Sequence, residues 1–113
     1  MIKRFLLSSI LVCASLPALG QSQNISLIAE VPRGGTVTVQ GQVERVMDYD
    51  EFRIADETGS IEVYVGPTRI DIAVGEALTV TGFVDSDLGP RDICASEIVK
   101  ADGTVIAVPN CDG

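Results

Sequence analysis

The chain has 113 residues, of which 16 are acidic and eight are basic, so its formal net charge is −8. It contains no histidine, which excludes catalytic and metal sites built on imidazole. No Cys-x-x-Cys pair, glycine-rich phosphate loop or Gly-x-Ser-x-Gly motif occurs. Carboxylate pairs could still supply acid–base chemistry, but with this many acids some pairing is expected by chance. The composition therefore favours a binding protein over an enzyme.

The first 20 residues have the pattern of a cleaved secretory signal. Lys3 and Arg4 precede an uncharged apolar run over residues 5–15, and Ala18-Leu19-Gly20 places small residues before the expected cleavage point. This run is shorter than the roughly 20 residues that cross a bilayer, so a membrane anchor or a buried helix is the weaker interpretation. Cleavage leaves residues 21–113 with a net charge of −10, because Lys3 and Arg4 are removed.

The remaining segment is long enough for one small domain. Its acidic surface repels phosphate backbones, which argues against nucleic acid and suits either solubility alone or a cationic partner. It carries no second long apolar run, so we expect no membrane span and a monomer.

Residues 21–35 form a leading segment. Ser26–Val31 predicts one or two turns of helix, which Pro32 ends. Arg33-Gly34-Gly35 then predicts a turn.

From residue 36 the hydrophobic period becomes two, which is typical of half-buried strands. In Thr36–Glu44 three valines share the inner face, and Gly41 marks a bend or bulge. Asp56–Gly59 predicts a tight turn in which Gly59 is free to take positive φ. Further strands are expected from Phe52 and over 60–65, 77–84, 91–100 and 104–108, with Asp102-Gly103 as a hairpin turn and at most one helical turn in 66–76.

These elements predict an all-β fold with little helix. A long first strand, a tight hairpin and then an interruption before the fourth strand match the order of a small Greek-key barrel, the OB-fold, with five to six strands. The barrel would occupy residues 36–113, including a C-terminal extension, and Gly41 would let the first strand serve both sheets.

Two cysteines, Cys94 and Cys111, remain after cleavage. An even pair in an exported chain is most simply a disulfide. It would contribute about 3 kcal/mol in the chain-entropy model. Two free thiols are the alternative.

The candidate binding site is one pole of the barrel. The loop between the first two strands and the loop between the fourth and fifth strands flank the ligand face of an OB-fold. Two side chains with the outward phase of their strands, Tyr64 and Phe83, could stack on a ligand, whereas Phe52 is expected in the core. The two loops carry Asp48, Tyr49, Asp50 and Glu51, and Asp85, Asp87 and Asp92.

Three guests suit these residues. Converging carboxylates could hold calcium, although Asp85-x-Asp87-x-Gly89 lacks the later bidentate glutamate of a calcium loop. A cationic peptide or protein is a second guest. A glycan that stacks on the aromatic rings is a third, and solvated loop acids without a guest are the plain alternative.

Residues from Ser26 to Val99 resemble a known family. The motifs are Gly41-Gln42-Val43, Phe52–Ile61 and Gly75–Asp85, together with Leu27-Ile28-Ala29 before Pro32. They resemble the bacterial OB-fold proteins of the periplasm, the stress-tolerance group named after its YgiW and YdeI members. The resemblance implies a periplasmic location, a role in envelope stress tolerance and no catalytic residue.

The sequence therefore predicts an exported, non-enzymatic OB-fold protein that binds a small ligand, a glycan or a cationic species without a cofactor. Two alternatives remain open. One is a single-stranded nucleic-acid-binding domain, which the charge disfavours. The other is a structural or interaction module of an envelope complex.

Overall fold

The computed structural model describes residues 24–86 and 89–109. It contains one short 3-10 helix and six strands, in the order η1 (Ile28–Glu30), β1 (Thr36–Asp48), β2 (Glu51–Asp56), β3 (Gly59–Tyr64), β4 (Ala77–Val84), β5 (Asp92–Lys100) and β6 (Val105–Ala107). The all-β prediction is confirmed. The predicted signal peptide, Asp87 and Cys111 lie outside the described residues. Within them, no helix is long and apolar enough to cross a membrane.

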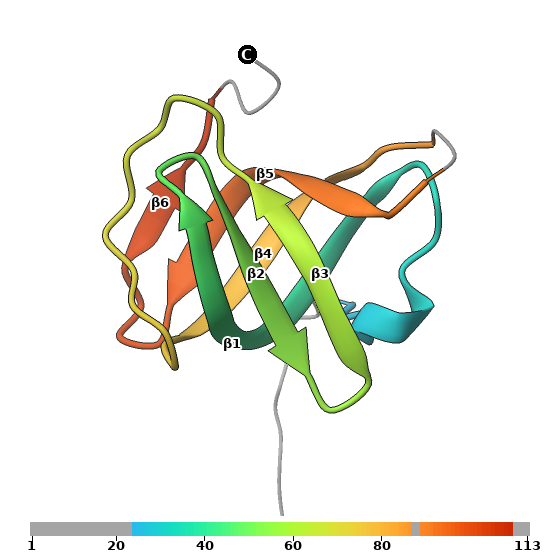
Figure 1. Cartoon of the computed structure of the whole chain (residues 1–113), viewed down its shortest axis with the longest axis horizontal. Coiled ribbons are helices and arrows are strands. Elements are labelled where there is room, and N and C mark those ends of the chain that lie inside the picture. Colours follow the sequence, from blue (N-terminus) through green and yellow to red (C-terminus); the bar gives the residue numbers. More distant parts are fainter. Residues whose placement is uncertain (1–23, 87–88, 110–113) are drawn as a thin grey trace, which may run out of the picture.

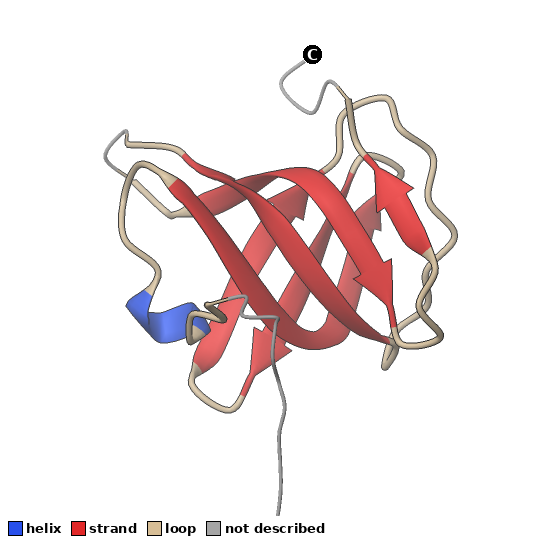
Figure 2. Ribbon diagram, turned by 180° about the vertical axis from the view of Figure 1, so that it is seen from behind, coloured by secondary structure: helices blue, strands red, loops and turns tan. Residues whose placement is uncertain are grey.

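Five of the strands close into a barrel (Figures 1 and 2). The sheet order is β3-β2-β1-β4-β5-β6, with antiparallel neighbours throughout. A parallel pairing between Glu62–Tyr64 and Asp92–Cys94 joins β3 to β5 and closes the ring. The short β6 adds to the outer edge of β5. This is the OB-fold arrangement that the sequence predicts.

The first strand serves both halves of the barrel, as predicted. Over Thr36–Gln42 it pairs with β4, and over Gln42–Asp48 it pairs with β2. Gly41 lies where it crosses from one partner to the other. A Cβ atom at Gly41 would lie 2.4 Å from the carbonyl oxygen of Ala55, so only glycine fits this crossing.

The core follows the period-two pattern. The inward side chains of the strands are almost fully buried, including the predicted core residue Phe52. The three valines of β1 behave as expected, since Val37, Val39 and Val43 are all buried. No polar or charged side chain of the described residues is buried, so the core is purely apolar.

The leading segment is held by the turn between β2 and β3. The carboxylate of Asp56 accepts a hydrogen bond from the Ile28 N–H at 2.9 Å, and Thr58 Oγ1 accepts one from the Ala29 N–H at 3.0 Å. These contacts fix η1 so that Ile28 and Val31 enter the core. The predicted helix is thus present as a single 3-10 turn.

The structure answers two local questions that the sequence leaves open. Gly59 does not adopt positive φ, because the Asp56 side chain closes the turn by accepting hydrogen bonds from the N–H groups of Thr58 and Gly59. Residues 66–76 form no helical turn. The Lys100 ammonium instead secures this segment, since Nζ lies 2.6 Å from the Asp71 carbonyl oxygen and 3.2 Å from Glu76 Oε2.

Candidate functional site

Strand register places the two predicted aromatic side chains on either side of β5. Tyr64 on β3 is opposite Cys94, and Cys94 is opposite Phe83 on β4. All three belong to the outward phase of their strands, and Phe83 is 51% exposed. Glu51 extends this row, because it is the partner of Tyr64 on β2.

A second row of outward-facing side chains lies two residues away along β2, β3 and β5. Arg53 is opposite Glu62, and Glu62 is opposite Asp92. Arg53 donates a hydrogen bond to Glu62 at 2.9 Å and another to Ser60 at 3.0 Å. Both members of this ion pair are about one-third exposed, so we expect it to orient Glu62 rather than to add much stability.

Glu62 links the acids of the two predicted loops. Partial burial, followed by the charges of Asp85 and Glu62, raises the pKa of Asp92. Partial burial also raises the pKa of Glu51, and the Glu62 carboxylate contributes to this through its charge and a hydrogen bond. The two loops therefore share one negative field. Sequence reasoning missed Glu62, although its outward phase on β3 marked it as a surface residue.

A cleft of about 580 Å³ opens beside Asp85 and Asp92. We call it the aromatic cleft. Four predicted site residues line it: Tyr64, Phe83, Asp85 and Asp92. Cys94 and Ser96 contribute on β5, and Val108 and Pro109 on the segment after β6. The structure thus brings together side chains from β3, β4, β5 and the start of the β4–β5 loop.

The β1–β2 loop stays outside the aromatic cleft. Tyr49 is 69% exposed, and its backbone N–H donates to Asp48 Oδ1 at 2.9 Å, which is a local contact. Asp48, Tyr49 and Glu51 line a separate small depression beside Arg69 and Ile70. Asp50 contributes to the field at Glu51 but lines no part of the aromatic cleft. The two loops therefore influence each other through the charges of their acidic side chains, but they do not line one shared cavity.

Metal binding gains no support from the described residues. Among residues 24–86 and 89–109, no three carboxylate or cysteine side chains are grouped so that they could hold a metal ion. Asp87, one of the predicted calcium ligands, lies outside this part of the chain.

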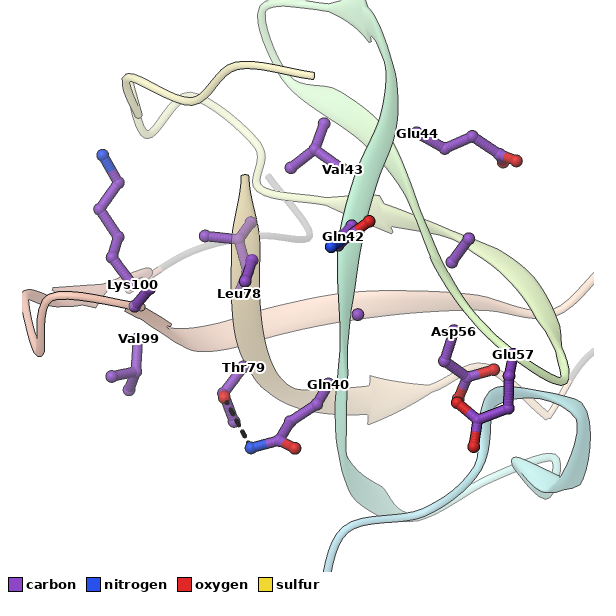
Figure 3. Close-up of a pocket in the computed structure, with 14 residues that line it drawn as sticks. Gln40, Gln42, Val43, Glu44, Asp56, Glu57, Leu78, Thr79, Val99 and Lys100 are labelled. Atoms are coloured by element: carbon purple, nitrogen blue, oxygen red, sulfur yellow. Dashed lines mark hydrogen bonds between the residues drawn. The ribbon is translucent and has the colours of Figure 1, made fainter. Parts of the chain in front are cut away.

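A second and larger cleft lies where β1 crosses between its two partners (Figure 3). Its volume is about 830 Å³, and we call it the glutamine cleft. Gln40 and Gln42 stand at its centre, and Gln40 Nε2 donates to Thr79 Oγ1 at 3.3 Å. Glu44 and Glu57 lie on one side and Lys100 on the other (Figure 3). No sequence pattern marked this cleft, because it arises from the coiling of β1.

Cys94 is disulfide-bonded. Its predicted partner, Cys111, lies outside the described residues. The pairing of these two cysteines therefore stays a prediction.

Comparisons with known proteins agree on the fold. No family model and no curated protein sequence matches the chain. The solved structure of the hypothetical protein YgiW from E. coli matches with a TM-score of 0.55 at 20% identity, covering 77% of this chain and all of that one. An OBody bound to hen egg-white lysozyme matches with a TM-score of 0.57 at 18% identity, covering 80% of this chain and 99% of that one. The resemblance to YgiW-type proteins is thus confirmed for the architecture, and the chain has the OB-like barrel fold of YgiW.

Proposed function

We propose that this protein is a periplasmic, non-enzymatic OB-fold protein of the YgiW type that contributes to envelope stress tolerance by binding cationic polypeptide segments. The observation that carries the proposal is the aromatic cleft, in which Tyr64 and Phe83 flank β5 beside the carboxylate of Asp92. The signal-like N-terminus and the disulfide at Cys94 support an exported protein.

The chemistry of the aromatic cleft suits lysine and arginine side chains. An ammonium or guanidinium group is attracted to the face of an aromatic ring and to a nearby carboxylate at the same time. Asp92 sits in a field that Asp85 and Glu62 make more negative, so a cation that enters relieves their mutual repulsion. A neutral glycan would leave this repulsion in place, and a nucleic acid would add to it.

The negative charge of the whole domain supports the same partner. The predicted mature chain carries −10, which attracts a basic polypeptide over distances up to about the Debye length of 10 Å at 0.1 M salt. The OBody with this fold is bound to lysozyme, which shows that such a barrel can dock on a protein surface.

Binding of a short peptide whose only charged side chain is one arginine tests the proposal. We expect Phe83→Ala to weaken binding about tenfold, since it removes the exposed ring from the aromatic cleft. We expect Asp92→Asn to weaken it several-fold through the lost charge. Isothermal titration calorimetry on residues 21–113 measures both effects.

The matched controls are Tyr49→Ala, an exposed aromatic ring outside the aromatic cleft, and Glu30→Gln, an exposed acid on η1. Both should bind like the parent. Equal losses in all four variants would show only a general effect of charge and exposed area, and the proposal would then be wrong. A tight complex with a neutral glycan that Phe83→Ala abolishes would replace the cationic partner.

The affinity should also depend on pH. Burial and neighbouring acids raise the pKa of Asp92, so it takes up its proton at a higher pH than an ordinary aspartate. Arginine stays charged throughout, and the peptide favours the ionised carboxylate. Affinity should therefore fall as the pH drops toward the raised pKa of Asp92. Titrations between pH 7 and pH 4 should show that Asp92→Asn flattens this dependence, and an unchanged profile would rule out Asp92 as the titrating group.

A further inference from the structure

The glutamine cleft lies on the same outer surface as the aromatic cleft. Along β4 the outward side chains are, in order, Phe83, Thr81, Thr79 and Ala77. Phe83 lines the aromatic cleft, whereas Thr79 and Ala77 line the glutamine cleft. The two clefts are thus the two ends of one strand surface, about 20 Å apart along the six residue steps from Phe83 to Ala77.

The two strands that connect the clefts carry no charged side chain of their own. Neither Thr36–Gln42 on β1 nor Ala77–Val84 on β4 contains an ionisable residue, although the chain has 16 acids and eight bases. The hydroxyl groups of Thr38 and Thr81 hydrogen bond at 2.9 Å across the two strands. We call these two segments the neutral strip. Its hydroxyl and carboxamide groups both donate and accept, so they suit the alternating N–H and C=O groups of an extended peptide.

Acidic side chains line the glutamine cleft beyond the end of the neutral strip. Glu44 on β1 and Glu57 in the β2–β3 turn are exposed and lie on the same side of the cleft (Figure 3). The positive charge on the opposite wall is already compensated, because Lys100 lies 3.2 Å from the Glu76 carboxylate. A guest that lies along the neutral strip therefore meets acidic groups at each end, while Glu97 on β5 flanks the strip opposite Thr81.

We infer that one extended polypeptide segment with two basic residues occupies both clefts. The first basic side chain lies between Phe83 and Asp92, and the second reaches Glu44 and Glu57. The neutral residues between them lie along the strip, with Gln40, Gln42 and Thr81 bonding to their backbone. At about 3.3 Å per residue, a span of about 20 Å places the two basic residues six positions apart, an even number that directs both side chains to the same face of the extended segment. This inference rests on the proposed function, since the aromatic cleft supplies the first anchor.

The spacing of the two basic residues tests the inference. Three peptides of equal length and a neutral Gly/Ser background are compared by isothermal titration calorimetry. One carries a single arginine, the second carries two arginines at positions i and i+2, and the third carries two arginines at positions i and i+6, so that each pair points to one face of the extended peptide. We expect the third to bind about tenfold more tightly than the first, because its second anchor binds within the same complex. The affinity of the second peptide should exceed that of the first only through the effect of its doubled charge.

The double substitution Glu44→Gln with Glu57→Gln separates this inference from the proposed function. It should remove the gain of the widely spaced peptide and leave the single-arginine peptide unchanged. The matched control is Glu30→Gln with Asp71→Asn, which removes the same charge from η1 and from the β3–β4 connection outside both clefts and away from the neutral strip. If the widely spaced peptide shows no gain, or if the control removes it equally, the second anchor is wrong while the aromatic cleft stands. If no peptide binds, the proposed function itself fails.

Discussion

Replacing Gly41 with alanine should cost more than about 3 kcal/mol of the free energy of unfolding, enough to leave little folded protein. A Cβ atom at this position would lie 2.4 Å from the Ala55 carbonyl oxygen, 2.9 Å from its carbonyl carbon and 2.9 Å from Ile54 Cγ1. The first two atoms are backbone of β2 and cannot move without breaking the pairing of β1 and β2 at the crossing. Urea denaturation followed by circular dichroism measures the loss.

Gly59→Ala is the matched control. Gly59 has no positive φ, and its nearest neighbour to an added Cβ is Ala29 Cβ at 4.0 Å, which is an ordinary contact. We expect this variant to stay within about 1 kcal/mol of the parent. Equal stability of the Gly41 and Gly59 variants would contradict the crossing geometry. Gly82→Ala should resemble Gly41→Ala, since its Cβ would meet the Cys94 carbonyl oxygen.

Replacing Asp56 with alanine should destabilise the domain by about 3 kcal/mol, because the carboxylate accepts several hydrogen bonds that no other group replaces. Oδ2 accepts from the Ile28 N–H at 2.9 Å. Oδ1 accepts from the Thr58 N–H at 2.7 Å, from Thr58 Oγ1 at 2.6 Å and from the Gly59 N–H at 3.2 Å. The leading segment should detach from the β2–β3 turn. Denaturation at pH 7 measures the loss, with Glu57→Ala as the exposed neighbouring control, which should change little.

The stabilisation by Asp56 should depend on pH. Burial alone would raise its pKa, but the hydrogen bonds from Thr58, Ile28 and Gly59 outweigh burial and lower it. A carboxyl whose pKa is lower in the folded state stabilises the fold above its unfolded pKa, near 4, and loses this contribution as the pH falls through the folded pKa. The parent and Asp56→Ala should therefore converge in stability below about pH 4. A constant difference down to pH 2 would contradict this assignment.

The strands and the barrel could be predicted from the sequence because the patterns that indicate them are local. Alternating valines in β1 gave the buried face, and a glycine on that inner face marked the crossing at Gly41. The position of Phe52 in the core followed from the same phase rule. The Asp56–Gly59 turn was located correctly, but its chemistry was not, because the side chain of Asp56 closes the turn and also holds a helix 28 residues away.

The candidate site was harder to predict from the sequence because it depends on closure of the barrel. The register that places Asp92 beside Glu62 comes from the parallel β3–β5 pairing, which no local pattern encodes. For the same reason the β1–β2 loop was expected in the site, whereas the structure gives it only an electrostatic link through Glu51 and Glu62. The glutamine cleft could not be predicted from the sequence, because its lining comes from four separate segments that meet only where β1 passes from β4 to β2.

Mapping a bound peptide by amide NMR shows whether the aromatic cleft is the binding site. The isotope-labelled domain, residues 21–113, is titrated with the peptide whose only charged side chain is one arginine. We expect the largest chemical-shift changes on Tyr64, Phe83, Asp92 and Cys94, and we expect them to weaken as salt is added. Changes confined to other surfaces, such as the β1–β2 loop around Tyr49, or no changes at saturating peptide, would contradict the assignment of the aromatic cleft as the binding site.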